Sequence, residues 1–172
     1  MAIIMDGKAL AAQMRAQLAG DVSTLKLKTG VTPGLAVVIV GENPASQVYV
    51  RTKGREAQAA GMNSFHHALP GDVTQEQLLA LVHRLNADPH VHGILVQLPL
   101  PDALDSQSIL QAVDPAKDVD GFHPLNAGRL SLGTPGLTPC TPQGCLRLLK
   151  HYVPETLAGK TAVVLGRSNI VG

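Results

Sequence analysis

The sequence predicts an α/β fold: a three-layer domain with a parallel sheet, followed by the start of a second strand–turn–helix unit. Two short aliphatic runs, Leu35–Val40 and Gly93–Leu98, have the length and composition of strands that are covered on both faces. Stretches with helical periodicity separate them, which favours parallel strands joined by right-handed crossovers. A third run, Thr161–Leu165, is followed by Gly166 and begins the same pattern again.

Composition excludes several classes of function. The 172 residues carry a formal net charge of +1 and only 16% of them are charged, so no nucleic-acid partner is indicated. Trp is absent and there are only two Phe and two Tyr, so the core must be aliphatic and Tyr49 stands out. No signal peptide, transit peptide or membrane span is visible, which predicts a cytoplasmic protein without a membrane partner.

The cysteines and histidines do not predict a metal site. Cys140 and Cys145 form a C-x4-C pair without further ligands at zinc spacing, which indicates reduced thiols. The histidines do not group either, and two close pairs are interpreted as surface or loop residues rather than ligands: His66-His67 and His90/His92.

The first predicted helix precedes the first strand. Asp6 is placed to cap it, and Gly30 with Pro33 ends it. Because its apolar residues repeat at mostly four-residue steps, they are expected to form one buried stripe. These residues are Leu10, Met14, Leu18, Val22 and Leu25.

Clear boundary signals mark the second predicted helix, which follows strand Leu35–Val40. Asn43 is a suitable N-cap, Pro44 suits the first helical position, and Gly61 suits the left-handed residue that ends many helices. A short second strand is predicted at Asn63–Leu69.

Two further helices are predicted in the first domain. Thr74 and Gln77 have the spacing of a capping box before an amphipathic stretch that Asp88-Pro89 closes. A short helix at Ser106–Val113 follows the strand Gly93–Leu98.

Lys53 lies on the apolar side of the second helix. Ser46, Tyr49 and Lys53 share one face at helical spacing. That face also carries the apolar residues Val50, Ala57 and Ala60. In one interpretation the lysine stem covers apolar surface and its ammonium reaches water. In the other the ammonium ends in a cleft, where desolvation lowers its pKa and it serves as a general acid or base.

Other polar residues are expected near Lys53. Gln97 ends a strand at the sheet edge where ligands bind in parallel α/β folds, so it either caps backbone groups or faces Lys53. Asp118 and Asp120 lie in the loop 117–124. Either one of them binds a ligand while the other meets solvent or a cap, or both close the loop as an Asx-turn pair.

The second half begins with residues 128–142, which are rich in Gly, Pro, Ser and Thr and are interpreted as an interdomain connection. Thr141 is expected to cap a helix with Pro142 at its first position that runs to about His151. Residues 157–160 read as a turn before the third aliphatic run.

The run from Gly166 to Gly172 has the character of a phosphate-binding turn. A glycine lets the backbone approach a phosphate, and Arg167 and Ser168 can bind anions, although the spacing does not match G-x-G-x-x-G. Because a βαβ domain cannot close on one strand, the sequence predicts that the second domain is incomplete.

Several segments, taken in order, resemble the bifunctional methylenetetrahydrofolate dehydrogenase/methenyltetrahydrofolate cyclohydrolase family. They are VGENPASQVYVRTK, GILVQLPLP, KDVDGFHPLNAGRL, TPCTPQG and VVLGRSNIVG. The resemblance covers the chain from Asp6 to Gly172. It implies a folate-binding catalytic domain over 1–127, a connection over 128–142, and the beginning of a Rossmann NADP-binding domain over 143–172.

The resemblance also implies roles for four residues of the first domain. Lys53 corresponds to the catalytic lysine, which is needed chiefly for the cyclohydrolase step. Tyr49 corresponds to the tyrosine that stacks on the folate and orients it. Gln97 resembles the glutamine that hydrogen-bonds and tunes the lysine, and Asp120 resembles the aspartate that holds the pterin ring.

Further positions are implied to shape the cleft or to bind the cofactor. Ser46 and the segment containing Pro99 and Leu100 would shape the cleft. The residues that match the cofactor turn are Gly166, Arg167 and Ser168, and Arg167 would favour NADP over NAD.

The implied chemistry is NADP-dependent oxidation of 5,10-methylenetetrahydrofolate followed by hydrolysis to 10-formyltetrahydrofolate. Tetrahydrofolate substrates and a second copy in a homodimer are the implied partners, and purine, methionine and histidine biosynthesis are the implied pathways.

Two other interpretations compete with this one. Tyr49-x-x-x-Lys53 also resembles the Tyr/Lys pair of short-chain dehydrogenases. In those enzymes a glycine-rich turn precedes the pair, whereas here the only such turn follows it. The chain could instead be a folate-binding module without turnover, which would bind a folate analogue and not convert substrate.

Overall fold

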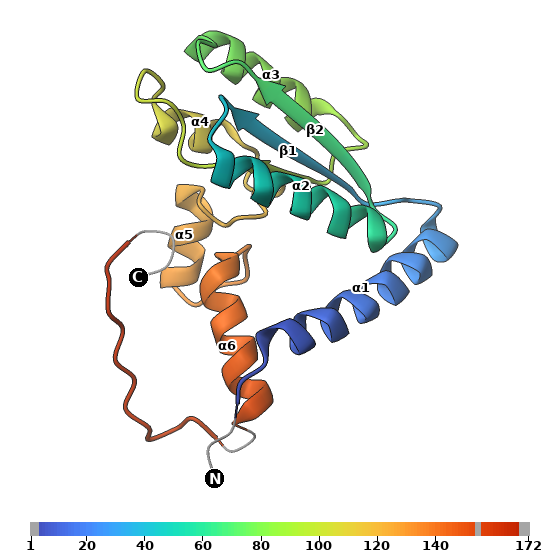
Figure 1. Cartoon of the computed structure of the whole chain (residues 1–172), viewed down its shortest axis with the longest axis vertical. Coiled ribbons are helices and arrows are strands. Elements are labelled where there is room, and N and C mark those ends of the chain that lie inside the picture. The colour runs from blue at the N-terminus through green and yellow to red at the C-terminus, as the bar shows by residue number, and fades with distance from the viewer. Residues whose placement is uncertain (1–3, 154–155, 169–172) are drawn as a thin grey trace.

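The computed structural model of the chain describes residues 4–153 and 156–168. Within these residues the elements follow in the order α1 (Gly7–Thr29), β1 (Gly34–Val40), α2 (Pro44–Ala59), β2 (Asn63–Leu69), α3 (Gln75–Ala87), β3 (Gly93–Val96), α4 (Ser106–Ala112), α5 (Pro124–Ser131) and α6 (Cys140–Tyr152) (Figure 1).

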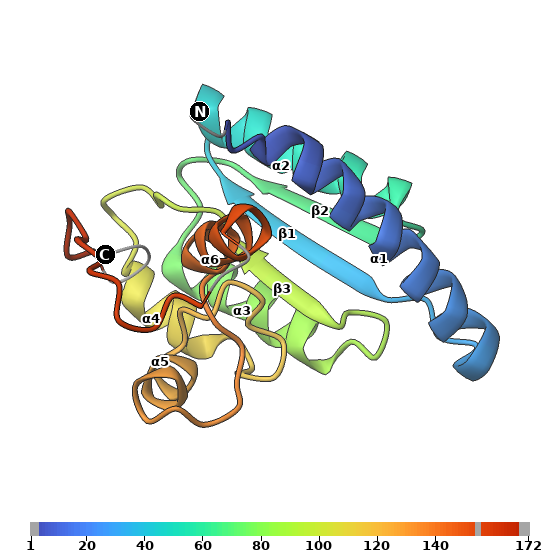
Figure 2. The ribbon, with the colours of Figure 1, turned by 90° about the horizontal axis from the view of Figure 1, so that it is seen from below.

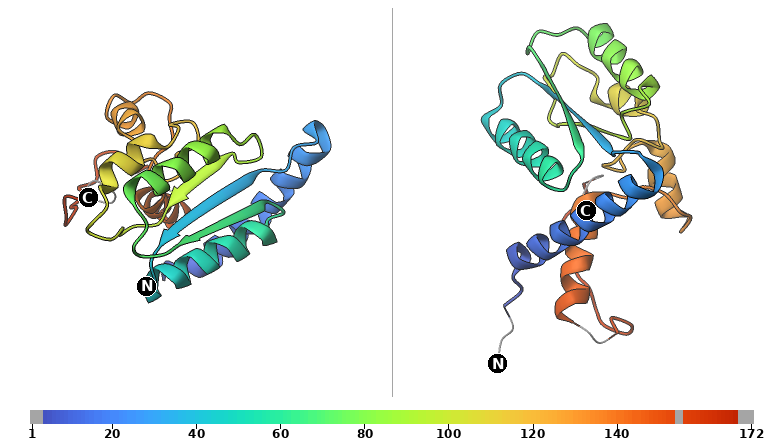
Figure 3. Two further views of the ribbon diagram at one scale, coloured as in Figure 1. Left: turned by 90° about the horizontal axis from the view of Figure 1, so that it is seen from above. Right: turned by 90° about the vertical axis from the view of Figure 1, so that its right-hand side faces the viewer.

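The strands form a parallel sheet in the order β2-β1-β3, which Figure 2 shows with β1 between its neighbours. Helices α2 and α3 lie on opposite sides of the sheet (Figure 3). The predicted three-layer parallel α/β domain is therefore confirmed. The strand Asn63–Leu69 is found as predicted, whereas β3 ends at Val96 rather than Leu98.

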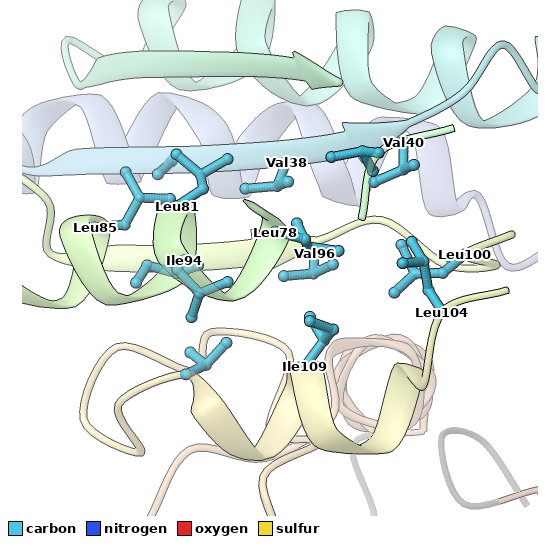
Figure 4. Close-up of a cluster of buried hydrophobic side chains, with 14 of the residues drawn as sticks. Val38, Val40, Leu78, Leu81, Leu85, Ile94, Val96, Leu100, Leu104 and Ile109 are labelled. Atoms are coloured by element: carbon cyan, nitrogen blue, oxygen red, sulfur yellow. The ribbon is translucent and has the colours of Figure 1, made fainter. Parts of the chain in front are cut away.

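One face of the sheet packs on α3 and α4 and forms the larger core (Figure 4). Leu78 and Ile109 have no exposed surface there, and Val38 contacts the same cluster from β1. Each such side chain contributes about 1.5–3 kcal/mol when fully buried. As composition predicted, this core is aliphatic.

The other face packs on α2. Val37, Ile39 and Leu95 of the sheet cluster with Val50 of α2. This contact fixes the rotation of α2, so the residues on the same side of the helix as Val50 lie toward the sheet.

The predicted boundary signals are confirmed. The Asp6 carboxylate accepts a hydrogen bond from the Ala9 amide at the start of α1. Asn43 caps α2, and Gly61 after its end has a φ of 83°. A reciprocal capping box is formed by Thr74 and Gln77.

Helix α1 buries much less of its apolar stripe than expected. Val22 is buried, while Met14, Leu18 and Leu25 keep 42%, 44% and 41% of their surface exposed. A hollow of about 790 Å³ lies between α1 and α6. The stripe therefore faces a gap that the described residues do not fill.

The second half differs from the sequence prediction at two places. The first residues of the 128–142 segment belong to α5, which continues to Ser131. Helix α6 begins at Cys140 with Pro139 as its N-cap, so the prediction that Thr141 caps it was wrong. Pro142 is tolerated one turn inside the helix because amides of the first turn lack intrahelical partners.

The predicted strand Thr161–Leu165 is not formed, although the turn before it is present, with the Lys160 amide donating to the Leu157 carbonyl. Val163, Val164 and Leu165 are 79%, 70% and 95% exposed, and Figure 1 shows residues 156–168 as an extended run apart from the sheet. A strand needs a neighbour for its backbone hydrogen bonds, and the described residues supply none here. Residues 169–172, including Gly172 of the predicted turn, lie outside the described residues.

Candidate functional site

A cavity of about 660 Å³ lies against the α2 side of the sheet. It extends from Gln97, just beyond the carboxyl end of β3, to Leu35 at the start of β1, so it covers more of the sheet face than the carboxyl edge alone. Its wall is formed by residues from α1, α2, the sheet, the loop after α4 and the start of α6. The polar or reactive ones are Arg15, Tyr49, Lys53, Glu56, Gln97, Asp120, Cys140 and Thr141.

Lys53 reaches this cavity because α2 is anchored on both sides of it. Val50 and Ala57, three residues before it and four after, are buried against the sheet, and Lys53 is half-buried between them. Its ammonium therefore ends in a cleft, as one of the two interpretations required. Tyr49, one turn earlier, is 61% exposed and forms part of the rim.

Gln97 is oriented toward Lys53 by its own backbone environment. Its amide nitrogen Nε2 donates to the Leu98 carbonyl at 2.7 Å, which leaves Oε1 facing the cavity. Lys53 Nζ donates to that Oε1 at 3.3 Å. The Gln97 backbone amide also donates to Val38 O, so the residue extends the β3 ladder. A side chain fixed in this way holds the ammonium at one place in the cavity.

Asp120 supplies the negative charge of the site. It is half-buried in the cavity wall. Burial raises the pKa of its carboxyl above the ordinary value, the Lys53 charge opposes this, and the Asp118 charge adds to it. The cavity therefore holds a cation and an anion that influence each other.

Asp118 caps backbone amides of its own loop and does not line the cavity. Its carboxylate accepts from the backbone amides of Phe122 and His123 and so closes the loop. Asp118 caps backbone groups while Asp120 faces the cavity, which is the arrangement of the first interpretation; ligand binding by Asp120 stays a prediction.

The remaining predicted site residues lie elsewhere. Ser46 is buried in the first turn of α2, and Leu100 is buried in the core formed with α3 and α4. Pro99 follows a cis peptide bond and is exposed. None of the three is in the cavity wall, so their role in shaping the cleft stays a prediction.

The predicted cofactor residues lie in the extended run 156–168. Gly166 has a φ of 136°, and Arg167 and Ser168 are exposed. A guanidinium and a hydroxyl beside a glycine suit a phosphate chemically. Their cofactor role stays a prediction.

Four polar or reactive residues of the cavity wall were not predicted as site residues. Arg15 of α1 and Glu56 of α2 form an ion pair of 2.9 Å at the wall. Cys140 and Thr141 bring the start of α6 to the cavity, and burial raises the pKa of the Cys140 thiol, with Asp120 adding to the effect. Cys140 and Thr141 lie in the string TPCTPQG, which contributes to the family resemblance, but their spacing in the sequence did not connect them to Lys53.

The described residues contain no group of three or more His, Cys, Asp or Glu side chains that could hold a metal ion. No described helix has the length and apolar character to cross a membrane.

Comparison with known proteins agrees with the geometry. Residues 5–120 match the family model of the tetrahydrofolate dehydrogenase/cyclohydrolase catalytic domain, and residues 139–172 match that of the NAD(P)-binding domain of the same proteins. The chain belongs to the tetrahydrofolate dehydrogenase/cyclohydrolase family. The second match shows that the extended run is the sequence of an NAD(P)-binding domain, although its strand is not formed here.

Individual members of the family are similar along nearly all of this chain. The bifunctional protein FolD of Nitrobacter hamburgensis is 62% identical over 171 residues, which are 99% of this chain and 58% of that protein. The chain therefore spans little more than half the length of such relatives.

Two solved structures show the same fold. FolD of Campylobacter jejuni has a TM-score of 0.95 at 49% identity, covering 99% of this chain and 60% of that one. The Trypanosoma brucei methylenetetrahydrofolate dehydrogenase-cyclohydrolase, solved with NADP cofactor and an inhibitor, has a TM-score of 0.95 at 38% identity, covering 99% and 58%.

Proposed function

We propose that this chain carries the folate site of a bifunctional enzyme that oxidises 5,10-methylenetetrahydrofolate with NADP+ and hydrolyses the methenyl product to 10-formyltetrahydrofolate. The observation that carries the proposal is the meeting of Lys53, Gln97 and Asp120 in one cavity of a family member. The three come from α2, the end of β3 and the loop after α4, and each was assigned a part in this chemistry from the sequence.

The hydrolysis needs a base beside the bridge carbon. In its neutral form Lys53 accepts a proton from the water that attacks the cationic methenyl carbon. The resulting ammonium then gives that proton to the ring nitrogen N5 as the bond between N5 and the bridge carbon breaks. The hydroxyl proton of the intermediate leaves to solvent as the carbonyl forms, which leaves the formyl group on N10 and releases one proton overall. Because Gln97 Oε1 accepts a hydrogen bond from Nζ, it holds the lysine in place during both transfers.

Asp120 and Tyr49 serve to orient the folate. An ionised Asp120 accepts hydrogen bonds from the N–H groups of the pterin ring, and its charge favours a cationic substrate. Tyr49 at the rim offers an aromatic face for the ring system that leaves the cavity.

The oxidation needs a hydride acceptor, which NADP+ supplies when bound. The residues of this chain that would hold its phosphate are Arg167 and Ser168, with Gly166 permitting close backbone approach. We place the whole protein in the cytoplasm as a homodimer that supplies one-carbon units for purine, methionine and histidine biosynthesis.

A second candidate function is a folate-binding module without turnover. The unformed strand Thr161–Leu165 favours it for the oxidation, because the NADP-binding half is not assembled in the described residues. The unformed strand does not argue against turnover in the hydrolysis step, because that step needs no nucleotide.

The test is hydrolysis of 5,10-methenyltetrahydrofolate by the purified chain, with Lys53→Ala and Lys53→Arg beside it. We expect Lys53→Ala to lose about 10²–10⁴-fold in rate, the usual contribution of a general base. Lys53→Arg should not restore activity because a guanidinium does not deprotonate. Restoration by arginine would exclude the general base, and folic acid binding without any hydrolysis would favour the binding module.

A further inference from the structure

Asp118 is a buried carboxylate beside the proposed folate site, and the proposed chemistry does not use it. Only 4% of its surface is exposed. In the described residues the ion pairs are Arg15–Glu56 and Arg55–Glu56, so no basic side chain pairs with Asp118 at short range. A buried charge without an ionic partner is costly unless hydrogen bonds satisfy it.

Hydrogen bonds from three donors satisfy this carboxylate. Its Oδ1 accepts from the Phe122 amide at 3.2 Å, and its Oδ2 accepts from the His123 amide at 2.8 Å. Oδ2 also accepts from Asn126 Nδ2 at 2.9 Å. Asn126 is 1% exposed, and the same Nδ2 donates to Pro115 O, so the side-chain pair connects α5 with both ends of the loop.

The turn that these bonds enclose is the one that carries Asp120. The Gly121 amide donates to the Asp118 carbonyl at 3.1 Å, which folds residues 118–121 back on themselves. On the other side, Asp118 bridges to Ile94 of β3, so the turn begins at a fixed point of the sheet. Asp120 is thus held between an anchored start and an anchored end.

The same turn also positions the start of α6. Gly121 has a φ of 68°, and a Cβ on it would lie 2.6 Å from the Thr138 carbonyl carbon, so the two backbones are in close contact. The Cys140 thiol donates to the Val119 carbonyl at 3.4 Å. Two walls of the cavity therefore depend on the turn that Asp118 closes.

Three charged or ionisable groups face Asp120 from different elements. Lys53 lies on α2, Cys140 on α6, and Asp118 on the loop of Asp120 itself. The Asp118 charge raises the pKa of Asp120, whereas the Lys53 charge lowers it.

We propose that Asp118 is a positioning residue of the folate site, which holds the turn that places Asp120 in the cavity and adds negative potential behind it. This inference rests on the proposed function, because a second carboxylate favours the cationic methenyl substrate. Asp118 itself does not touch the cavity wall.

The experiment compares variants that separate charge from hydrogen bonding. Asp118→Asn removes the charge with almost no change of shape. Its oxygen can keep the bonds from the His123 amide and Asn126 Nδ2, while its NH2 replaces the acceptor of the longest bond, the one from the Phe122 amide at 3.2 Å. Asp118→Asn combined with Asn126→Ser removes the same charge with the side-chain partner changed. Asn126→Ser alone is the matched control, since it changes the same partner and keeps the charge.

The first measurement is an NMR titration of 13C-labelled aspartate carboxyls, with Asp120 assigned by its loss in Asp120→Asn. We expect both variants with asparagine at 118 to lower the Asp120 midpoint, as the removal of a like charge does. Asn126→Ser should leave the midpoint at the wild-type value. Equal midpoints in all four chains, or failure of the double variant to fold, would overturn the proposal and leave Asp118 a structural residue.

The second measurement is the KM for 5,10-methenyltetrahydrofolate in the hydrolysis assay, which should rise in the two asparagine variants, because the cationic substrate loses negative potential, and stay at the wild-type value in Asn126→Ser. A KM that is unchanged in both asparagine variants would also contradict the proposal. If the wild-type chain neither hydrolyses the substrate nor binds folic acid, the proposed function fails, and the NMR comparison still decides what Asp118 does to Asp120.

Discussion

Two aliphatic runs in this chain have nearly the same composition, but only one of them forms a strand. Leu35–Val40 becomes the central strand, with Val37 and Val38 at 1% and 0% exposure. Thr161–Leu165 remains extended without strand pairing, with Val164 at 70%. The first run has strands on both sides and helices on both faces, and the second has neither in the described residues. Neighbours, rather than composition alone, decide whether such a run becomes a strand.

The same contrast separates the two halves of the site. Lys53, Gln97 and Asp120, which we propose act on folate, lie on elements that the sheet fixes, and they meet in one cavity. Arg167 and Ser168 lie on the run that lacks its sheet. We therefore propose that the folate half of the site is assembled without the nucleotide half.

The largest expected effect comes from placing a charge in each run. Val38→Asp buries an unpaired carboxylate in the core and should cost at least about 4 kcal/mol of unfolding free energy. Val164→Asp should change stability by less than about 0.5 kcal/mol because its side chain is already in water. Urea unfolding followed by circular dichroism measures both, and similar losses would show that the second run is packed.

A second pair compares two glycines with positive φ. Gly121→Ala should cost about 1–3 kcal/mol, because its φ is 68° and the new Cβ would meet the Thr138 backbone. Gly166→Ala should cost less, since nothing lies within 4 Å of the new Cβ and only the φ of 136° is strained. Thermal unfolding gives both values, and a large loss at Gly166 would contradict the comparison.

The sequence predicted the sheet-forming half well because local and tertiary signals agree there. Asn43, Thr74 and Gly61 are decisive local signals, and each lies at a helix boundary that packing also requires. The strand Thr161–Leu165 was mispredicted because its pattern describes a strand in a sheet that the described residues do not contain.

Within the site, positions that depend on a single helix or strand were predicted from the sequence, whereas contacts between distant elements were not. The Tyr49–Lys53 face and the position of Gln97 follow from helical spacing and strand direction. The approach of Cys140 to Asp120 depends on how α6 packs against the turn at Gly121, and no spacing in the sequence encodes that contact.

Alkylation of the two cysteines tests which part of α6 belongs to the proposed folate cavity. In Cys145→Ser, iodoacetamide modifies Cys140 in the cavity wall and should lower folic acid affinity by about tenfold, roughly 1.4 kcal/mol. In Cys140→Ser, modification of Cys145 should leave affinity unchanged, because that residue does not line the cavity. Calorimetric titration measures the difference, and equal losses would show that α6 as a whole supports the site.

The smallest effect is the pH dependence of stability. The pKa of Asp120 is raised by burial, so the folded state binds its proton more tightly, and stability falls as pH rises from 3.8 to the raised value. The pKa of Asp105 is lowered by Ser108, so its contribution is present above 3.8 and is lost as pH falls. Melting temperatures between pH 3 and 7 should therefore shift oppositely in Asp120→Asn and Asp105→Asn, and shifts of the same sign would contradict these assignments.

The most direct test of the central claim is methenyltetrahydrofolate hydrolysis by the whole chain, with Lys53→Ala and Val164→Asp measured in parallel. We expect wild-type rates for Val164→Asp and a loss of at least about 100-fold for Lys53→Ala. A wild-type rate no higher than that of Lys53→Ala, or an equal loss in Val164→Asp, would show that the folate half does not function apart from the run that follows it.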